Sequence, residues 1–446
     1  MSAVVESIRG RVSSALVAGD PDRPFAFGPE GVVRRSRFVR QVLGVAHRLP
    51  SSTAVVNLCE DRYRFLVAFC AAAVRGQVTL LPSSRAPATV RLVQAAYPDS
   101  YCLGDGPLAP QPPRFHCLPA RLPEAEGEAP LIDAAARVAI GFTSGSTGQP
   151  GAHDKYWDSF TTSTVQNLAA LEGLLDPDGS WLVATVPPQH MYGMEMSVLL
   201  PLLGPVAVHV ARPFFPLEVA GALADAPAPA LLATTPVHLR ALVESGVRLP
   251  PMAGIVSATA PLPRELAAAA EARFGCEVRE VFGSTETCVF ARRRTACEPA
   301  WTPLPGVRLA PRPDGTLVHA PHLPRPVPLA DLFELHPDGR FELRGRQADL
   351  LEIAGKRASL AELTRHLLEV PGVRDGAVVQ LDPDPSGVRR IAAVAVAPGC
   401  RAGEVLAALK QHVDPVFLPR RLRLVESMPR EASGKLPRAE VLALLH

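Results

Sequence analysis

The sequence predicts a layered α/β protein, with a large N-terminal domain of sheets and helices followed by a small α+β domain. Three observations lead to this fold class. Short runs rich in β-branched residues alternate with stretches of helical apolar spacing through most of the chain. The 446 residues exceed what one ordinary hydrophobic core accommodates. The pattern then changes after about Arg346, so we expect an N-terminal domain over 1–346 and a C-terminal domain over 347–446.

The larger domain is expected to contain parallel strands connected by helices, because the two patterns alternate along the chain. The expected buried strands are Thr53–Leu58, Gln77–Leu81, Arg137–Gly141, Trp181–Val186, Val206–Val210 and Gly254–Ser257. The expected helices are Arg62–Val74, Leu217–Ala224 and Pro263–Phe274.

The smaller domain is expected to begin with a capped helix. Ser359 and Glu362 form the Ser-x-x-Glu pattern of a capping box directly before an apolar run, which predicts a helix over Leu360–Val370. The remaining expected elements are strands at Ala377–Gln380, Ile391–Ala397 and Leu422–Glu426 and a helix at Ala402–Val413.

The composition indicates a globular protein of the cytoplasm. Net charge is +2 with both signs interspersed, which gives no electrostatic case for nucleic acid or an anionic membrane as the main partner. Residues Met1–Gly19 lack the apolar core of a signal peptide, and the most apolar stretch, Met196–Ala211, is too short to span a bilayer. The eight cysteines include no C-x-x-C pair, so we expect buried, reduced thiols and neither disulfides nor a metal framework.

A loop rich in glycine and hydroxyl residues gives the first chemical signal. Residues Phe142–Pro150 (FTSGSTGQP) follow an expected strand, and glycines there allow successive N–H groups to converge on phosphate oxygens. The spacing matches neither the Walker-type P-loop nor the nucleophile elbow of hydrolases. Taken alone, such a loop is more often a plain surface connection.

Two further segments strengthen the functional interpretation. Residues Glu280–Thr287 (EVFGSTET) place a glycine, hydroxyls and the carboxylate of Glu286 at a strand end, where that carboxylate could hold Mg²⁺. Residues Pro429–Arg438 (PREASGKLPR) place one lysine, Lys435, on a glycine-containing loop. By itself, a lone lysine is usually a solvated surface charge.

These three segments, in this order, resemble the adenylate-forming family of acyl-CoA synthetases, aryl-acid ligases, luciferases and peptide-synthetase adenylation domains. Further segments are similar to family motifs in the same order, and together they cover nearly the whole chain: Pro187–Gly193, Ala260–Pro263, Leu329–Leu332, Gly345–Arg346 and Gly355–Arg357. The resemblance implies ATP and Mg²⁺ as cofactors, a small carboxylic acid as substrate, and a C-terminal domain that moves and carries the catalytic lysine.

The resemblance also assigns roles to individual residues. The residues implied in catalysis are Lys435, Thr285, Glu286 (also the Mg²⁺ ligand) and His190. The residues implied in ATP binding are Thr143, Ser144, Gly145, Ser146, Thr147, Gly148, Phe282 (stacking on adenine), Asp331 (binding the ribose), Arg346 and Arg357. The candidate acyl-pocket residues are His190, Met191, Tyr192, Met194, Val237, Ser257, Ala258 and Cys288.

The chain departs from the family pattern at several positions. The lysine that usually follows the phosphate-loop proline is Gly151 here, and Lys155, four residues on, is a candidate to replace it. Ala348 stands where a charged hinge residue is usual, and Glu352 stands where a lysine is common. The first step of the reaction is therefore expected, whereas the domain rearrangement for the second step is open.

The implied reaction is activation of the acid as an acyl-AMP, followed by transfer of the acyl group to a thiol. Residues Gln189–Tyr192 offer no carboxylate to pair with a substrate ammonium, and burial of an unpaired ammonium would be costly. We therefore expect an acid without an α-amino group, with a hydroxybenzoate- or hydroxycinnamate-like ring favoured and a medium-chain fatty acid as the alternative. A weaker resemblance, to stand-alone ligases of aryl-polyene and xanthomonadin-like pathways, favours an acyl carrier protein over CoA as the acceptor.

Two other kinds of protein remain as alternatives. One is an enzyme that releases its adenylate to an amine or oxidises it, and the other is a non-catalytic relative that binds adenylates or acts as a scaffold. Retention of Lys435, Glu286 and the hydroxyl-rich loop disfavours the non-catalytic alternative.

Overall fold

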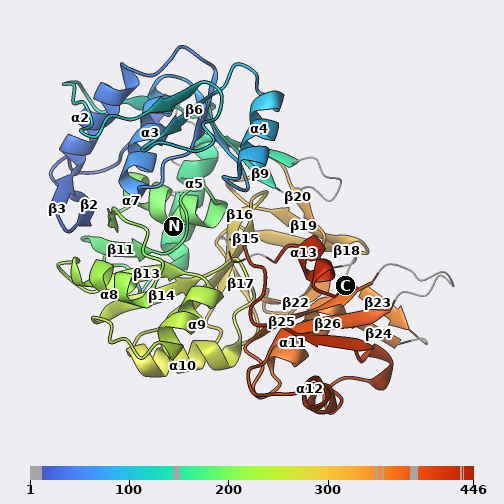
Figure 1. Ribbon diagram of the computed structural model, residues 1–446. Helices are drawn as coiled ribbons and strands as arrows, with labels where there is room; N and C mark the ends of the chain where they lie inside the picture. The colour runs from blue at the N-terminus through green and yellow to red at the C-terminus, as the bar shows by residue number, and fades with distance from the viewer. Residues whose placement is uncertain are drawn as a thin grey trace. The chain divides into compact units, whose positions relative to one another are not determined.

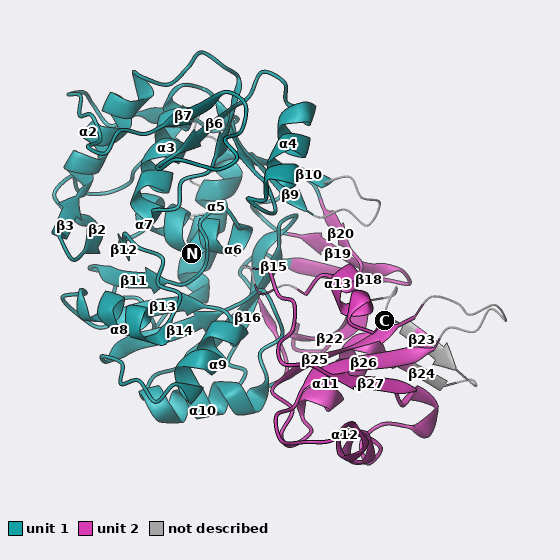
Figure 2. Cartoon of the chain, in the orientation of Figure 1, with its two compact units in different colours: residues 1–298, 304–307, 320–325 teal, residues 299–303, 308–319, 326–446 magenta. Residues whose placement is uncertain are grey.

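A computed structural model describes residues 13–143, 151–346, 350–353, 356–381, 390–431, 434 and 436–445. The chain forms two compact units, which Figure 2 shows in different colours. Unit 1 comprises 1–298, 304–307 and 320–325, and unit 2 comprises 299–303, 308–319 and 326–446. The residues just before position 346 thus cluster with unit 2. The division predicted from the sequence, into 1–346 and 347–446, stays a prediction.

The first sheet of unit 1, of which β6 and β9 are labelled in Figure 1, has six strands in the order β10-β9-β5-β4-β6-β7. The strands are β4 (Ala54–Asn57), β5 (Val78–Leu81), β6 (Tyr101–Gly104), β7 (Phe115–Cys117), β9 (Arg137–Thr143) and β10 (Gly151–Tyr156). The helices α2 (Arg35–Ala46), α3 (Arg62–Val74), α4 (Pro87–Ala96) and α5 (Trp157–Ala170) accompany it, and β1 (Ser13–Ala15) pairs with β8 (Leu131–Asp133). All but one of the neighbouring strand pairs are parallel, the exception being β9 with β10.

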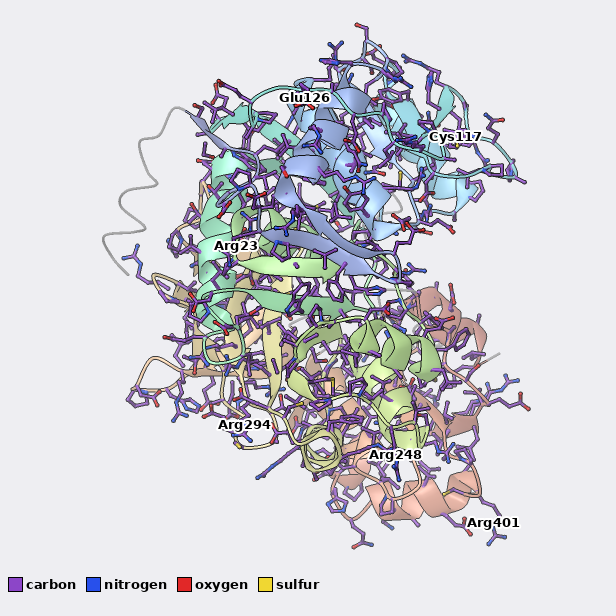
Figure 3. All side chains as sticks on the ribbon, turned by 90° about the vertical axis from the view of Figure 1, so that its left-hand side faces the viewer. Arg23, Cys117, Glu126, Arg248, Arg294 and Arg401 are labelled. Carbon is purple, nitrogen blue, oxygen red and sulfur yellow. The ribbon has the colours of Figure 1, made fainter. Side chains whose placement is uncertain are left out.

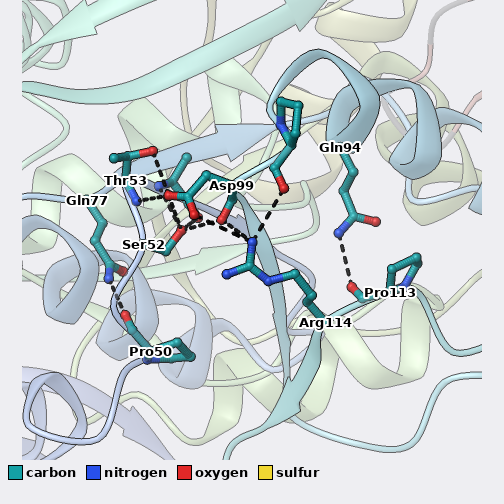
Figure 4. Close-up of polar contacts among 10 residues, drawn as sticks. Pro50, Ser52, Thr53, Gln77, Gln94, Asp99, Pro113 and Arg114 are labelled. Atoms are coloured by element: carbon teal, nitrogen blue, oxygen red, sulfur yellow. Dashed lines mark hydrogen bonds and ion pairs between the residues drawn. The ribbon is translucent and has the colours of Figure 1, made fainter.

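One end of this sheet is closed by hydrogen bonds around Asp99, which precedes β6 (Figure 4). The Asp99 carboxylate accepts hydrogen bonds from Thr53 N at 2.8 Å and from the Ser52 hydroxyl at 3.2 Å. The Asp99 carbonyl oxygen accepts one from Arg114 Nη1 at 2.5 Å. These bonds join the segments that lead into β4, β6 and β7, so the amino ends of those strands are held by the protein's own groups.

The second sheet of unit 1 runs in the order β16-β15-β14-β13-β11-β12-β2-β3. Its strands are β2 (Pro24–Gly28), β3 (Gly31–Arg34), β11 (Ser180–Ala184), β12 (Val206–His209), β13 (Ala230–Thr234), β14 (Met252–Ser257), β15 (Val278–Ser284) and β16 (Cys288–Arg293). The pairs from β2 through β15 are parallel. The carboxyl ends of these strands therefore meet at one edge.

Helices bury both faces of this second sheet. One core forms between it and the helices α8 (Pro216–Ala224), α9 (Pro236–Glu244) and α10 (Arg264–Phe274). The largest core joins residues of both sheets with α3, α5, α6 (Met191–Met194), the π-helical turn η1 (Glu195–Leu199) and α7 (Leu200–Leu203). Continuous apolar strands such as β12 and β13 are typical of parallel sheets covered on both faces.

The described part of unit 2 is built from small sheets and α-helices. Its strands are β17 (Thr302–Pro303), β18 (Arg308–Arg312), β19 (Gly315–His319), β20 (Val327–Leu329), β21 (Asp331–Leu335), β22 (Phe341–Arg346), β23 (Leu350–Ile353), β24 (Lys356–Ser359), β25 (Asp375–Gln380), β26 (Ile391–Val396) and β27 (Arg421–Leu424). Its helices are α11 (Leu360–Leu368), α12 (Ala402–Leu409), α13 (Arg438–Ala443) and the 3₁₀ turn η3 (Pro415–Phe417). A core of its own lies between β25–β26–β27 and the helices α11 and α12.

The α/β fold class predicted from the sequence is confirmed, and each predicted strand and helix is present, although α12 ends at Leu409 and not at the predicted Val413. The helix α3 has the predicted bounds, and Ser359 Oγ accepts the predicted capping hydrogen bond from Glu362 N at 3.0 Å. All eight cysteines are free in this structure. The prediction that they are buried is wrong for Cys117, labelled at the surface in Figure 3, and for Cys297, because both side chains are exposed. Among the described residues, no helix combines the length and apolar character needed to cross a bilayer.

Candidate active site

Hydroxyl side chains gather where the parallel strands of the second sheet end. Thr234, Ser257 and Ser284 are the last residues of β13, β14 and β15, and Thr185 directly follows β11. The hydroxyl oxygens of Thr185 and Thr234 are 3.0 Å apart. Open α/β sheets bind ligands outside the carboxyl ends of their strands, so this edge is the first place to look for a site. Ser257 was predicted from the sequence, whereas Thr185 and Thr234 were not, although both lie at the ends of buried strands.

Two of the buried hydroxyls on this edge lack partners. Ser257 is fully buried, and neither its hydroxyl nor that of Thr259 has a hydrogen-bond partner among the described residues. Thr259 also has a φ of +80°, in a region that costs a β-branched residue energy. Buried hydroxyls are nearly always hydrogen-bonded in folded proteins, so these two groups are poised to meet a ligand.

The candidate acyl-pocket segment begins at the short helix α6. His190 is its N-cap residue, and the backbone N–H of Met194 donates to the His190 carbonyl at 2.7 Å. The phenol of Tyr192 donates to the carbonyl of Val256 at 2.8 Å, and burial raises the pKa of Tyr192 above its ordinary value. The Tyr192 hydroxyl therefore connects α6 to β14. Because that hydroxyl is already hydrogen-bonded, only the ring of Tyr192 is available to contact a substrate.

The other pocket candidates fall into two groups. Met191, Met194, Ala258 and Cys288 are buried, as are Tyr192 and Ser257. Val237, by contrast, is 40% exposed on α9 and does not share their environment.

Three elements converge beside Met191. A side chain on Gly141 of β9 would lie 2.7 Å from Thr285 Cγ2 and 3.5 Å from Met191 Cε. The strand that leads into the phosphate loop, the Thr285 turn and the start of α6 are therefore in van der Waals contact. Only glycine at position 141 leaves room for this approach.

A second polar group contains the candidate magnesium ligand. The hydroxyl oxygen of Thr143, the last residue of β9, lies 3.2 Å from Nε2 of His153 on β10. The same nitrogen is 3.4 Å from Glu286 Oε1. Burial lowers the pKa of His153, although the Glu286 carboxylate opposes this. The sequence analysis missed His153, because the pairing of β9 with β10 is what brings it to Glu286.

The chemistry of this group fits magnesium. Mg²⁺ is usually held by one or two carboxylates, with phosphate oxygens and water completing its shell. The described residues contain no cluster of three or more His, Cys, Asp or Glu side chains. Glu286, with 31% of its side chain exposed, is a single carboxylate of the required kind. The predicted loop residues Ser144, Gly145, Ser146, Thr147 and Gly148 lie outside the described residues.

Lys155, the candidate to replace the missing loop lysine, contacts the turn that carries Glu286, and its role as a replacement stays a prediction. The residue is only 4% exposed, and its amino group donates to the Glu286 carbonyl at 3.3 Å and to Cys288 Sγ at 3.5 Å. Cys288 has a φ of +56°, and burial raises the pKa of its thiol to about 12. Lys155 thus braces the turn that carries Glu286, and the thiol stays protonated.

A buried carboxylate completes this bracing. Glu195, 1% exposed at the start of η1, accepts hydrogen bonds from Ser163 Oγ at 2.7 Å, Asn167 Nδ2 at 2.9 Å and Val289 N at 3.1 Å. Burial raises the pKa of Glu195, and the charge of Lys155 is among the groups that oppose the rise. This buried network was not predicted from the sequence, because its members come from segments that are distant along the chain.

Phe282 is half-buried near the end of β15, and its ring packs edge-on against Phe290 at a centroid distance of 5.2 Å. Its stacking on adenine stays a prediction.

Unit 2 holds the remaining predicted residues. Asp331, at the start of β21, is buried and lies opposite Arg346 in the β21–β22 hairpin. The side chains of Arg346 and Arg357, and the whole of Lys435, lie outside the described residues. The turn before Lys435 is described: Gly434 has a φ of +81°, and its carbonyl accepts from Arg430 Nη1 at 2.8 Å.

Arg430 is anchored in turn by Asp375 on β25. Its Nε donates to Asp375 Oδ2 at 2.8 Å and its Nη2 to Oδ1 at 2.5 Å. This two-point pair fixes the guanidinium that holds Gly434. The sequence analysis missed both residues, since the 55 positions between them give no local signal.

Comparison with known proteins agrees with these features. A family model described as AMP-binding enzyme matches residues 45–318. A 4-coumarate–CoA ligase from Cereibacter sphaeroides is 29% identical over 303 residues, covering 66% of this chain and 69% of that protein. A probable 2-succinylbenzoate–CoA ligase from Mycobacterium tuberculosis is 29% identical over 335 residues, covering 67% and 82%.

Solved structures share the fold at lower identity. The ATP-bound MatB protein of Rhodopseudomonas palustris superposes with a TM-score of 0.81 at 19% identity, covering 98% of this chain and 97% of that one. The o-succinylbenzoate CoA synthetase of Bacillus subtilis, bound to its acyl-adenylate intermediate, gives 0.79 at 20% identity over 94% and 95%. The family model covers more than half of the chain, and the motifs occur in the expected order. The protein belongs to the AMP-binding enzyme family.

Proposed function

We propose that the protein activates an aromatic carboxylic acid with ATP and transfers the acyl group to a phosphopantetheine thiol. In the first step a carboxylate oxygen attacks the α-phosphorus of ATP, the bond to pyrophosphate breaks, and an acyl-AMP forms. In the second step the thiol sulfur attacks the acyl carbon, AMP leaves with the electron pair of the carbon–oxygen bond, and the thiol proton passes to solvent.

The observation that carries the proposal is the contact chain from Thr143 through His153 to Glu286. It places the first residue of the glycine-rich loop beside the carboxylate of the Phe282–Glu286 segment. A triphosphate needs both hydrogen-bond donors and charge neutralisation when a second anion approaches it. Mg²⁺ bound at Glu286 would supply the neutralising charge. Lys435 is proposed to bridge the acid and the α-phosphate.

The proposal of an aromatic acid rests on the pocket candidates and on the relatives. Met191, Met194, Ala258 and Cys288 are buried and mainly apolar, which suits a ring. The similar proteins named above are ligases for 4-coumarate and 2-succinylbenzoate, both of which contain a ring. A medium-chain fatty acid is the alternative, because methionine side chains adapt to flexible chains.

An α-amino acid is disfavoured by the state of Glu195. This residue lies five positions after His190, and its carboxylate already accepts hydrogen bonds from Ser163, Asn167 and Val289. It is therefore not available to pair with a substrate ammonium. A buried ammonium without a counter-charge would lose binding energy.

Pyrophosphate exchange with a panel of benzoates, cinnamates, fatty acids and amino acids tests the proposal. We expect hydroxylated benzoates or cinnamates to support the fastest ATP–pyrophosphate exchange. Exchange that is fastest with an α-amino acid would contradict the assignment of the pocket. Binding of ATP without exchange for any acid would contradict the proposed activity as a whole.

A further inference from the structure

The strands β9 and β10 carry an alternating pattern of glycines and polar residues on one face. Their antiparallel pairing sets Gly141 opposite His153 and Thr143 opposite Gly151. Residues two positions apart on a strand share a face, so both polar side chains lie on the same side of the strand pair, each opposite a glycine. The ring of His153 therefore has space to extend across the two strands toward Thr143, its diagonal neighbour.

The two glycines are needed for this arrangement. A Cβ atom on Gly151 would lie 2.9 Å from the hydroxyl oxygen of Thr143 and 3.4 Å from Nε2 of His153. Because the first distance is too short for a Cβ atom, the Thr143 hydroxyl would have to move. Gly141 leaves room for the side chain of Thr285 in the same way. A side chain at either position would therefore separate groups that are now in contact.

His153 contacts two groups that are expected to bind the triphosphate and its metal ion. Its Nε2 is hydrogen-bonded to the Thr143 hydroxyl at 3.2 Å and lies 3.4 Å from Glu286 Oε1. A carboxylate oxygen can only accept, so the tautomer that suits both contacts carries the proton on Nε2. When Nε2–H donates to the hydroxyl oxygen, the Thr143 hydroxyl keeps its own proton for another acceptor, such as a phosphate oxygen.

The strand β10 supports the Glu286 turn at two levels. Lys155 is buried, and its amino group donates to the Glu286 carbonyl. His153, two positions earlier on the same face, faces the Glu286 carboxylate where the two side chains are 26% and 31% exposed. The Lys155 contact fixes the backbone of the turn, and the His153 contact orients the side chain that would meet a ligand.

We propose that His153 is a positioning residue for the metal–triphosphate complex, which orients the Thr143 hydroxyl and the Glu286 carboxylate together in the space that Gly151 leaves. This inference rests on the proposed function and deepens it at the ATP site. Carboxylates that bind metal ions are usually held by a further hydrogen-bonding group. Loss of such a group weakens metal binding by about 10–100-fold.

The test measures binding of α,β-methylene-ATP in excess Mg²⁺, because this analogue cannot be cleaved to an acyl-AMP. Calorimetry gives its dissociation constant, and that of AMP is measured in parallel. His153→Ala removes the ring, and His153→Gln keeps an N–H donor at a similar reach. His336→Ala in unit 2 is the matched control, because His336 Nε2 lies 3.5 Å from Glu342 Oε1 and the two side chains are 29% and 25% exposed.

We expect His153→Ala to raise the dissociation constant of the analogue by about tenfold or more, together with the Mg²⁺ concentration that binding requires. His153→Gln should recover most of the affinity, and His336→Ala should bind as the unmodified chain does. The affinity for AMP, which lacks the β- and γ-phosphates, should change little in every variant. A merely structural role would instead lower the melting temperature and weaken both ligands together.

Gly151→Ala tests the space that the proposal requires. It should weaken binding of the analogue severalfold in the unmodified chain, because the added Cβ atom displaces the Thr143 hydroxyl. In the His153→Ala chain it should add little, because the arrangement that it disturbs is already lost. Additive losses would show that Gly151 does not serve His153.

Three results would overturn the proposal: unchanged binding of the analogue to His153→Ala, equal losses for the analogue and AMP, or no recovery in His153→Gln. Pyrophosphate exchange tests the proposed function separately. An unmodified chain that binds the analogue through His153 but supports exchange with no acid would refute the proposed function and leave this inference standing. An unmodified chain that does not bind the analogue would overturn both.

Discussion

The turn that carries Glu286 and the turn that precedes Lys435 are supported in different ways. The Glu286 turn is braced from inside the core of unit 1 by Lys155, which is 4% exposed, with Glu195 bonded to the strand that follows. The Lys435 turn is held by Arg430 and Asp375, whose side chains are 19% and 25% exposed, and by the left-handed backbone of Gly434.

Because one turn is supported by buried groups and the other by partly exposed groups, substitutions at the two turns should affect stability and catalysis differently. Groups buried in a polar network contribute to the fold and to the geometry of the site at once, since their loss leaves unsatisfied partners in the core. A loop held by one partly exposed ion pair can be altered without unfolding the unit that carries it. We therefore expect substitutions at the Glu286 turn to change stability and activity together, and removal of the Lys435 or Arg430 side chain to change activity with little loss of stability.

The largest effect is expected at Lys435. Lys435→Ala should lower adenylate formation by about 10²–10³-fold, the scale for loss of one preorganised charge-stabilising donor. The melting temperature and ATP binding should stay close to those of the unmodified chain. Pyrophosphate exchange, thermal unfolding and ATP titration measure the three quantities. Near-normal exchange would remove Lys435 from the mechanism.

The next effect concerns Lys155. Lys155→Met should lower the free energy of unfolding by about 1–3 kcal/mol, because the variant removes both hydrogen bonds of a buried amino group and a positive charge near the buried Glu195 carboxylate. Exchange should fall as well, since the Glu286 turn loses two hydrogen bonds. Denaturant unfolding measures the first effect.

A double variant distinguishes charge from packing. Lys155→Met/Glu195→Gln removes both charges and should recover part of the lost stability, because no unpaired charge then remains in the core. If the double variant is less stable than the single one by the sum of the separate losses, the two residues do not act as a pair.

The motif residues of the two turns could be predicted from the sequence, whereas the residues that support those turns could not. The predicted strands and helices were evident from periodicity, because each is a local pattern such as the apolar run of β12 or the capped start of α11. Thr143, Glu286 and Lys435 were identified because they stand in short motifs.

The supporting residues were not evident, because their partners are distant in sequence. Lys155 contacts Cys288 across 133 positions, and Arg430 contacts Asp375 across 55. His153 and Lys155 are two positions apart on β10, so their side chains lie on the same face of the strand. The pairing of β10 with β9 brings that face to the Glu286 turn. A charged residue inside an apolar pattern, such as Glu195, was the one signal that could have indicated the buried network.

A smaller effect is expected at Arg430. Arg430→Ala should reduce exchange roughly tenfold, about 1.4 kcal/mol in the barrier, because the guanidinium no longer holds the Gly434 carbonyl. The loss should appear in kcat more than in KM for ATP. Arg430→Lys keeps a charge without the two-point geometry and should recover only part of the rate.

The control for Arg430 is Arg365→Ala, which removes an exposed pair with Glu369 on α11 of the same unit. Exchange in that variant should equal that of the unmodified chain, because exposed pairs on helices contribute little. Equal losses in both variants would mean that the Arg430 effect reflects the stability of unit 2 and not the position of Lys435.

The smallest effect is expected at Gly434, where the comparison can be made sharpest. Gly434→Ala places a Cβ atom on a residue with a φ of +81°, which costs roughly 1–2 kcal/mol. Gly399 has a φ of +83° in the same unit and open space around the site of a Cβ atom, so Gly399→Ala carries the same backbone cost far from the lysine loop in sequence. Both variants should lose similar stability by denaturant unfolding, whereas exchange should fall severalfold only in Gly434→Ala. A similar fall in both would show that the loss in Gly434→Ala follows from the lower stability of unit 2 and not from a displaced Lys435, and the Lys435 turn would then not differ from the Glu286 turn in coupling stability to activity.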